Sequence, residues 1–166
     1  MQDSQLVAKL NKVVTSRFLK FLEKEAKKDN EKYLEFFKEF SRFIKEGICV
    51  DFEYRDQLAK LLRFESSMTE SGEFTSLTEY LDRAKDEQKE IYYLIGPNRA
   101  AIEAGPFLEG LKARGLEVIF FYEPIDEYVL NNLSEFEEKK LVSAARSDLE
   151  LGDPSEEAAG EALGED

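Results

Sequence analysis

The chain has 166 residues, 42% of them hydrophobic and 36% charged, which is enough to build one ordinary domain around a core. A formal net charge of -13 disfavours nucleic acid and anionic membrane surfaces as partners. The chain has no His and one Cys, Cys49, so His-based catalysis, the common zinc sites and an internal disulfide are excluded. No apolar run approaches the roughly 20 residues that span a bilayer, and no secretory signal is visible.

The first third of the chain has the periodicity of helices. Apolar residues recur every three or four positions over residues 4–27, which predicts an amphipathic helix. Asp29 or Asn30 can cap a second helix, and Gly47 is expected to end it in a left-handed conformation. A third helical pattern covers residues 54–62. The second helix carries an aromatic stripe of Tyr33, Phe36, Phe37, Phe40, Phe43 and Ile44. Such a stripe could hold a flat cofactor, but its helical spacing is typical of a core, and we interpret it so.

The second part of the chain alternates helices with short apolar runs. Ser76 and Glu79 form the sequence pattern of a capping box, which predicts a helix start. Strands are expected at residues 91–95, 116–122 and 140–144, with helices between them. The fold class predicted is therefore α/β: a helical coil of about three helices, followed by a small α-β-α sandwich with a short, mainly parallel sheet.

The chain divides into three predicted segments, which are the helical coil over residues 1–64, the small α/β unit over residues 65–147, and a tail over residues 148–166. The tail has eight acidic residues, no basic residue and three glycines. Because it offers little apolar surface to bury, it is expected to be a disordered linker. An acidic interaction tail is the alternative.

The strand at residues 91–95 ends in Gly96, Pro97 and Asn98 before a helix, an outline shared with phosphate-binding loops. Neither the dinucleotide-binding nor the P-loop glycine pattern occurs here. We interpret Gly96 as an ordinary turn residue, with phosphate binding as the less favoured alternative.

The helix expected at residues 124–133 is the most suggestive local feature. Ile125, Val129 and Leu133 would face the sheet. Tyr128, Asn131 and Asn132 would lie outside this stripe. Tyr128 is then a boundary residue that presents an apolar ring beside acids and amides, a composition that suits a contact surface.

Five separated segments resemble the Hsp90 chaperone family, and they occur in that family's order. The segments are LLRFESS at residues 61–67, TSLTEY at 75–80, IYYL at 91–94, EPIDEY at 123–128 and KLVS at 140–143. The resemblance covers residues 2–151 and corresponds to the later part of the Hsp90 middle domain. It implies that the chain is a fragment, between a missing ATP-binding domain and a missing dimerisation domain.

The family's functional residues carry over unevenly. In the family, a catalytic loop with the pattern Ser-Arg-Glu-x-Leu-Gln reaches the ATP bound by the preceding domain, and its arginine neutralises the γ-phosphate. Met1 stands at the leucine position and Gln2 at the glutamine position, so Gln2 is a remnant of ATPase coupling without the arginine. Glu127, Tyr128 and Asn131 match the helix that bacterial relatives turn toward client proteins, the unfolded polypeptides on which a chaperone acts.

The sequence therefore leaves two functions of different classes open for this chain. In the first, the chain is a client-binding and interdomain-coupling module without ATPase activity. The resemblance implies ATP and magnesium only in the parent protein, which is a homodimer, and it implies client polypeptides, the neighbouring domains and co-chaperones as partners. It also implies a cytoplasmic location, or a mitochondrial matrix location for an organelle member. The alternative is a small enzyme in which Glu123, Asp126 or Glu127 and a hydroxyl of Tyr92 or Tyr122 perform acid-base chemistry.

Overall fold

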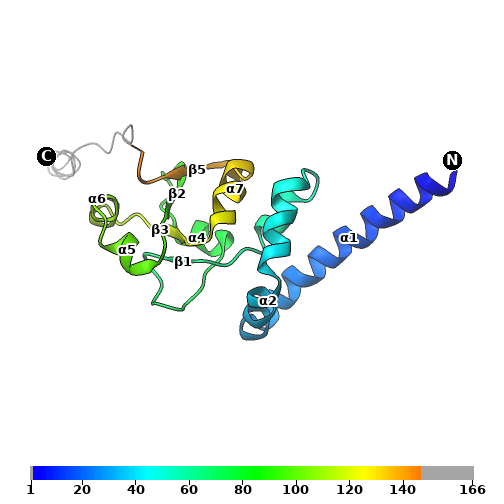
Figure 1. Cartoon of the computed structure of the whole chain (residues 1–166), viewed down its shortest axis with the longest axis horizontal. Helices are drawn as coiled ribbons and strands as arrows, with labels where there is room; N and C mark the ends of the chain where they lie inside the picture. The colour runs from blue at the N-terminus through cyan, green and yellow to red at the C-terminus, as the bar shows by residue number, and fades with distance from the viewer. Residues whose placement is uncertain (1, 147–166) are drawn as a thin grey trace, which may run out of the picture.

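The computed structural model describes residues 2–146, which form a helical part followed by a mixed sheet with its own helices. The predicted tail lies outside the described residues. The helical part consists of α1 (Gln2–Lys28), α2 (Asn30–Val50) and α3 (Arg55–Ala59). Figure 1 shows α1 extending away from the rest of the molecule, with its C-terminal end beside α2.

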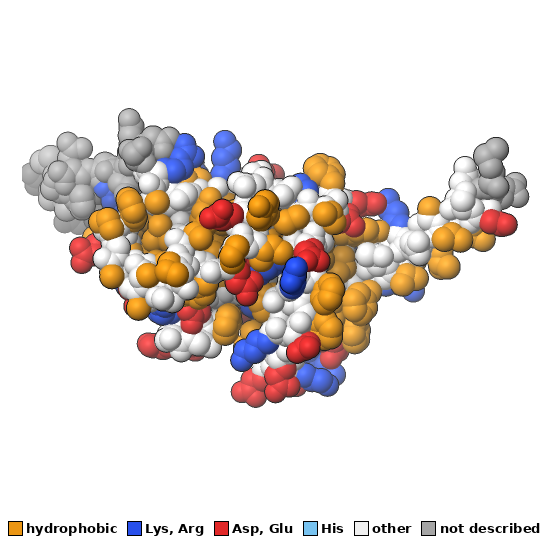
Figure 2. All heavy atoms as spheres, viewed as in Figure 1, with side chains coloured by type: hydrophobic (Ala, Val, Ile, Leu, Met, Phe, Trp, Pro, Cys, Tyr) orange, Lys and Arg blue, Asp and Glu red, His pale blue; other side chains and the backbone are white. Residues whose placement is uncertain are grey.

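Only the C-terminal half of α1 contributes to the core, through Leu19, Leu22 and Ala26. Much of the apolar face of α1 is exposed, as Figure 2 shows along the helix. This exposed face consists of Leu6, Val7, Leu10, Val13, Val14, Phe18 and Phe21. The helix predicted from the periodicity is present, but most of its apolar stripe is not covered by any of residues 2–146.

The second helix begins as predicted, because the carboxylate of its N-cap, Asp29, accepts a hydrogen bond from the Lys32 amide at 3.1 Å. Its predicted end at Gly47 is wrong: the helix continues to Val50, and Gly47 has an ordinary helical conformation. A Cβ at Gly47 would lie 3.0 Å from the side chain of Leu58 on α3. Glycine is therefore used here for the close approach of two helices.

The interpretation of the aromatic stripe of α2 as core is confirmed only for part of it. Tyr33, Phe37 and Ile44 are buried, whereas Phe40 and Phe43 are exposed. Phe36, Phe40 and Phe43 follow one another at steps of four and three residues along one edge of the stripe, and this edge is the exposed one, whereas Phe36 is half-buried.

The sheet has five strands in the order β1-β3-β2-β5-β4. Their bounds are β1 Glu65–Ser66, β2 Glu90–Ile95, β3 Val118–Phe121, β4 Glu135–Phe136 and β5 Lys139–Ser143. The three central strands are parallel, and β1 and β4 pair antiparallel at the two edges. The predicted α/β class and mainly parallel sheet are confirmed, and the two edge strands are additions that the sequence did not reveal.

Helices cover both faces of the sheet because its residues alternate between two cores. Tyr92, Leu94, Val118 and Phe120 pack with α5 (Arg99–Glu103) and α6 (Phe107–Ala113). The second core lies on the opposite face and includes Ile91, Ile119 and Phe121. This core also contains residues of α4 (Leu77–Arg83), α7 (Pro124–Asn132) and the helical part of the chain. One continuous core thus joins the two segments that were predicted to meet near residue 64.

Candidate functional site

The N-terminal turn of α7 is fixed by local chemistry. Glu123 is the N-cap, Pro124 occupies the first helical turn, and Asp126 accepts a hydrogen bond from the Glu123 amide at 3.0 Å. Figure 1 shows α7 beside α2, and the two helices pack against each other. The position of α7 therefore depends on both the sheet and the helical part.

The buried face of α7 differs from the predicted one by a small rotation. Val129 and Leu133 are buried as predicted, but Ile125 is only half-buried. Asp126 and Leu130 are buried instead. The pattern of apolar residues could not reveal this, because it treats an acid as a solvent-facing residue.

Lys45 of α2 explains why an acid can be buried there. Its amine lies 2.8 Å from Glu123 Oε2 and 2.8 Å from Asp126 Oδ1. Lys45 is 7% exposed and Asp126 is 2% exposed. Lys45 was not among the residues expected to be functional, although its place between Ile44 and Ile48, on the apolar side of a helix, is a signal of it in the sequence.

The three residues singled out by the resemblance share the outer face of α7. Glu127, Tyr128 and Asn131 are all exposed. Tyr128 lies outside the buried stripe as predicted, and at 64% exposure it projects further into solvent than a boundary residue does. Asn132 donates a hydrogen bond to the Tyr128 carbonyl at 2.8 Å, within the last turn of the helix. The outer face of α7 therefore presents an aromatic ring beside a carboxylate and an amide.

Part of the enzyme alternative also comes together in space. Tyr122, Glu123 and Asp126 line a cavity of about 300 Å³, while Glu127 points to solvent. The Glu123 and Asp126 carboxylates bind Lys45, and the Tyr122 hydroxyl donates to Glu65, a third carboxylate that lines the cavity. Burial and this hydrogen bond raise the pKa of Tyr122. The groups are thus held in ion pairs and a hydrogen bond, and the arrangement disfavours proton transfer by Tyr122 near neutral pH.

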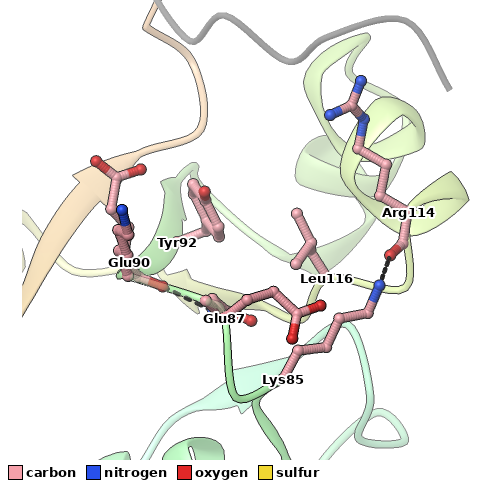
Figure 3. Close-up of a pocket in the computed structure, with 8 residues that line it drawn as sticks. Lys85, Glu87, Glu90, Tyr92, Arg114 and Leu116 are labelled. Atoms are coloured by element: carbon pink, nitrogen blue, oxygen red, sulfur yellow. Dashed lines mark hydrogen bonds between the residues drawn. The ribbon is translucent and has the colours of Figure 1, made fainter. Parts of the chain in front are cut away.

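Tyr92, the other hydroxyl considered, lies at a separate cavity of about 410 Å³ (Figure 3). Lys85 donates to the Arg114 carbonyl at 2.9 Å, and the Arg114 guanidinium points away from the Lys85 amine. Burial raises the pKa of Tyr92. The neighbouring Glu90 carboxylate raises this pKa further, and Lys85 is bound to the Arg114 carbonyl, so this arrangement disfavours proton transfer by Tyr92 near neutral pH.

The loop after β2 uses glycine for packing. A Cβ at Gly96 would lie 2.7 Å from Cγ1 of Ile102. The Asn98 side chain caps α5 by accepting a hydrogen bond from the Ala101 amide at 2.9 Å. These contacts give Gly96 and Asn98 structural roles and give the phosphate interpretation no support.

Among residues 2–146, no three His, Cys, Asp or Glu side chains are grouped as a metal site would require. None of the helices in that part of the chain combines the length and hydropathy needed to cross a membrane. Gln2 is the first residue of α1, and its side chain lies outside the described residues.

Comparison with known proteins identifies the family. The Hsp90 protein family model matches residues 1–165. The chain is 52% identical to a chaperone protein HtpG of Desulfitobacterium hafniense over 98% of its length, and 49% identical to one of Desulfotalea psychrophila over 91%. It is 44% identical to a mitochondrial TNF receptor-associated protein 1 homolog of Dictyostelium discoideum over 90%. It spans about a quarter of the length of these relatives, covering 26%, 24% and 22% of them. The chain belongs to the Hsp90 family.

Proposed function

We propose that this chain acts as the later part of an Hsp90 middle domain and contacts client polypeptides through the outer face of α7. The observation that carries the proposal is the exposed ring of Tyr128 between Glu127 and Asn131, on a helix whose other face is buried. A tyrosine ring offers apolar area, and its hydroxyl offers a hydrogen bond. An unfolded segment, which exposes both apolar side chains and backbone amides, is the kind of partner that such a mixed surface suits.

The second part of the proposal is mechanical coupling within a longer chaperone. The continuous core that joins α1, α2 and the sheet supports it, because a displacement of the helical part is then transmitted to α7. ATP and magnesium belong in this proposal to a preceding domain of the parent protein, and dimerisation to a following one. The chain itself contributes no ATPase activity, and we propose a cytoplasmic or mitochondrial-matrix location and co-chaperones as further partners.

The test is to measure binding of an unfolded polypeptide to the chain and to a Tyr128→Ala variant. Reduced and carboxamidomethylated lysozyme is a suitable probe, because its blocked cysteines keep it unfolded. Native lysozyme controls for attraction between opposite charges. The matched variant is Phe107→Ala, which removes another exposed aromatic ring, on α6.

We expect Tyr128→Ala to lower the free energy of unfolding by about 1 kcal/mol or less, as surface and boundary substitutions do. It should weaken binding of the unfolded probe, while Phe107→Ala should not. A stability loss of about 3 to 5 kcal/mol, typical of a core aromatic, with unchanged affinity in the folded fraction would contradict the proposal.

A further inference from the structure

We infer that Lys45 is a positioning residue, which sets the orientation of α7 and thereby of the surface formed by Glu127, Tyr128 and Asn131. The part of this inference that concerns binding rests on the proposed function. The part that concerns the order of α7 stands on the geometry of Lys45 alone.

The ion pairs of Lys45 connect parts of the chain that are far apart in sequence. Lys45 lies on α2, and its two carboxylates, Glu123 and Asp126, lie at the N-cap and in the first turn of α7. The contact to Glu123 is a hydrogen bond as well as an ion pair. The contact to Asp126 Oδ1 is an ion pair whose angles fall outside those of a hydrogen bond. The amine thus bridges two successive points at the start of one helix.

The burial of Asp126 makes the position of α7 depend on the ion pairs with Lys45. A carboxylate removed from water needs a compensating cation or several hydrogen bonds. The other oxygen of Asp126 accepts the Glu123 amide, and among the described residues no Lys or Arg other than Lys45 forms an ion pair with Asp126. Removing the amine therefore leaves the Asp126 carboxylate buried without a cation. Water can solvate this carboxylate if the first turn of α7 moves outward.

The other contacts of α7 hold the helix against the core, but they constrain its rotation about its own axis less than the ion pairs do. Val129, Leu130 and Leu133 are buried, and apolar contact of this kind is non-directional. The ion pairs with Lys45 have a direction, and Glu127 and Tyr128 follow Asp126 immediately in the same helix. A rotation of the first turn is accordingly transmitted to the exposed ring.

Three variants and a control test this role. Lys45→Met removes the amine and keeps an unbranched side chain of comparable reach, and Lys45→Arg keeps the charge. The triple variant Lys45→Met/Glu123→Gln/Asp126→Asn removes the bridge without leaving a buried charge, so it keeps the test valid if Lys45→Met alone does not fold. Lys38→Met is the control, because Lys38 is an exposed residue of the same helix.

The first readout is amide hydrogen exchange, resolved by residue. We expect exchange in α7 to become about tenfold faster in Lys45→Met and in the triple variant, with β2 and β3 unchanged, since local openings differ in free energy from one segment to another. Lys45→Arg should restore protection, and Lys38→Met should resemble the parent chain. Equal acceleration in all segments, or none in α7, would overturn the inference.

The second readout is the affinity for reduced and carboxamidomethylated lysozyme. We expect the triple variant to bind roughly three- to tenfold more weakly, the size of effect exerted by residues that act through a neighbour. If Tyr128→Ala leaves affinity unchanged, the proposed function fails, whereas the exchange data still decide the role of Lys45. If Tyr128→Ala weakens binding and the triple variant does not, the proposed function stands and the positioning role of Lys45 is wrong.

Discussion

Arg83 donates two hydrogen bonds to the carboxylate of Glu117, from Nε to Oε2 at 3.0 Å and from Nη2 to Oε1 at 2.8 Å. Glu117 is 6% exposed and also accepts the Ser66 hydroxyl at 2.5 Å. Since Arg83 ends α4, Glu117 precedes β3 and Ser66 lies in β1, this carboxylate ties one helix to two strands.

Replacing Arg83 with Met should destabilise the fold by about 2 kcal/mol, because it leaves a buried carboxylate without its cation. The measurement is urea unfolding at neutral pH. Arg42→Met is the matched control, since Arg42 pairs with Glu46 at 2.9 Å on an exposed helix face. That pair should contribute at most about 0.5 kcal/mol. Equal effects of the two substitutions would show that burial of Glu117 does not matter.

Two glycine substitutions should act in opposite directions. Gly96→Ala places a Cβ 2.7 Å from Ile102 and should cost about 1 to 3 kcal/mol, as overpacking does. Adding Ile102→Ala should remove the steric part of this loss, seen as a positive coupling in the double-mutant cycle. Gly110→Ala on exposed α6 meets nothing within 4 Å and should stabilise by about 0.5 to 1 kcal/mol. Thermal unfolding of the variants measures whether each substitution raises or lowers the stability.

The turn between β4 and β5 should be open to stabilisation. Phe136 pairs with Lys139, so the turn has two residues, Glu137 and Glu138, with φ values of 47° and 65°. Both lie in the left-handed region, which favours Asn and Gly. The double variant Glu137→Asn/Glu138→Gly should raise the free energy of unfolding by about 1 kcal/mol. No gain in the urea midpoint would mean that another contact of the two glutamates compensates the strain.

Stability should fall at alkaline pH because of buried tyrosines. Tyr80 is buried, and its burial raises its pKa to about 12 from 10.0. A folded pKa above the unfolded value means that the contribution is complete below pH 10 and is lost between about 10 and 12. The loss at the upper end should be about 2 to 3 kcal/mol from Tyr80. Urea midpoints measured across this pH range test how steeply stability falls, and Tyr80→Phe should make the fall less steep. Part of the fall should remain in this variant, because burial also raises the pKa of Tyr33 to about 12.

The chain by itself should neither bind ATP tightly nor hydrolyse it, because neither of the glycine-rich phosphate-binding patterns occurs in it. Calorimetric titration with magnesium-ATP and a phosphate-release assay measure this directly. Steady turnover that disappears in Gln2→Ala would contradict it.

The structural features that could be predicted from the sequence are those that depend on residues close together in the chain. The Ser76 and Glu79 capping box is present, with the Ser76 hydroxyl accepting at 3.2 Å and the Glu79 carboxylate at 3.0 Å. Strands β2 and β3 consist mostly of consecutive apolar residues, a pattern that indicates burial on both faces without knowledge of the neighbouring strands. Edge strands of two residues have no such run, and neither β1 nor β4 could be recognised.

Features that depend on contacts distant in sequence were not predictable in the same way. Gly47 follows the rule for a helix end, but Leu58 of the next helix decides its role. Lys45 and Asp126 each resemble a solvent-facing charge, and only the packing of α2 on α7 brings them together. The exposed face of α7 was predictable because exposure needs no partner.

The two-residue edge strands limit how any extended polypeptide can associate with this sheet. A peptide that joins a sheet edge needs a run of unpaired backbone groups, and β1 and β4 offer only two residues each. At β4 the chain turns back at once through Glu137. The same shortness discourages edge-to-edge aggregation. Recognition of an unfolded segment by this part of the chain would therefore rely on side chains and not on a shared hydrogen-bond ladder, which makes it tolerant of the segment's direction and register.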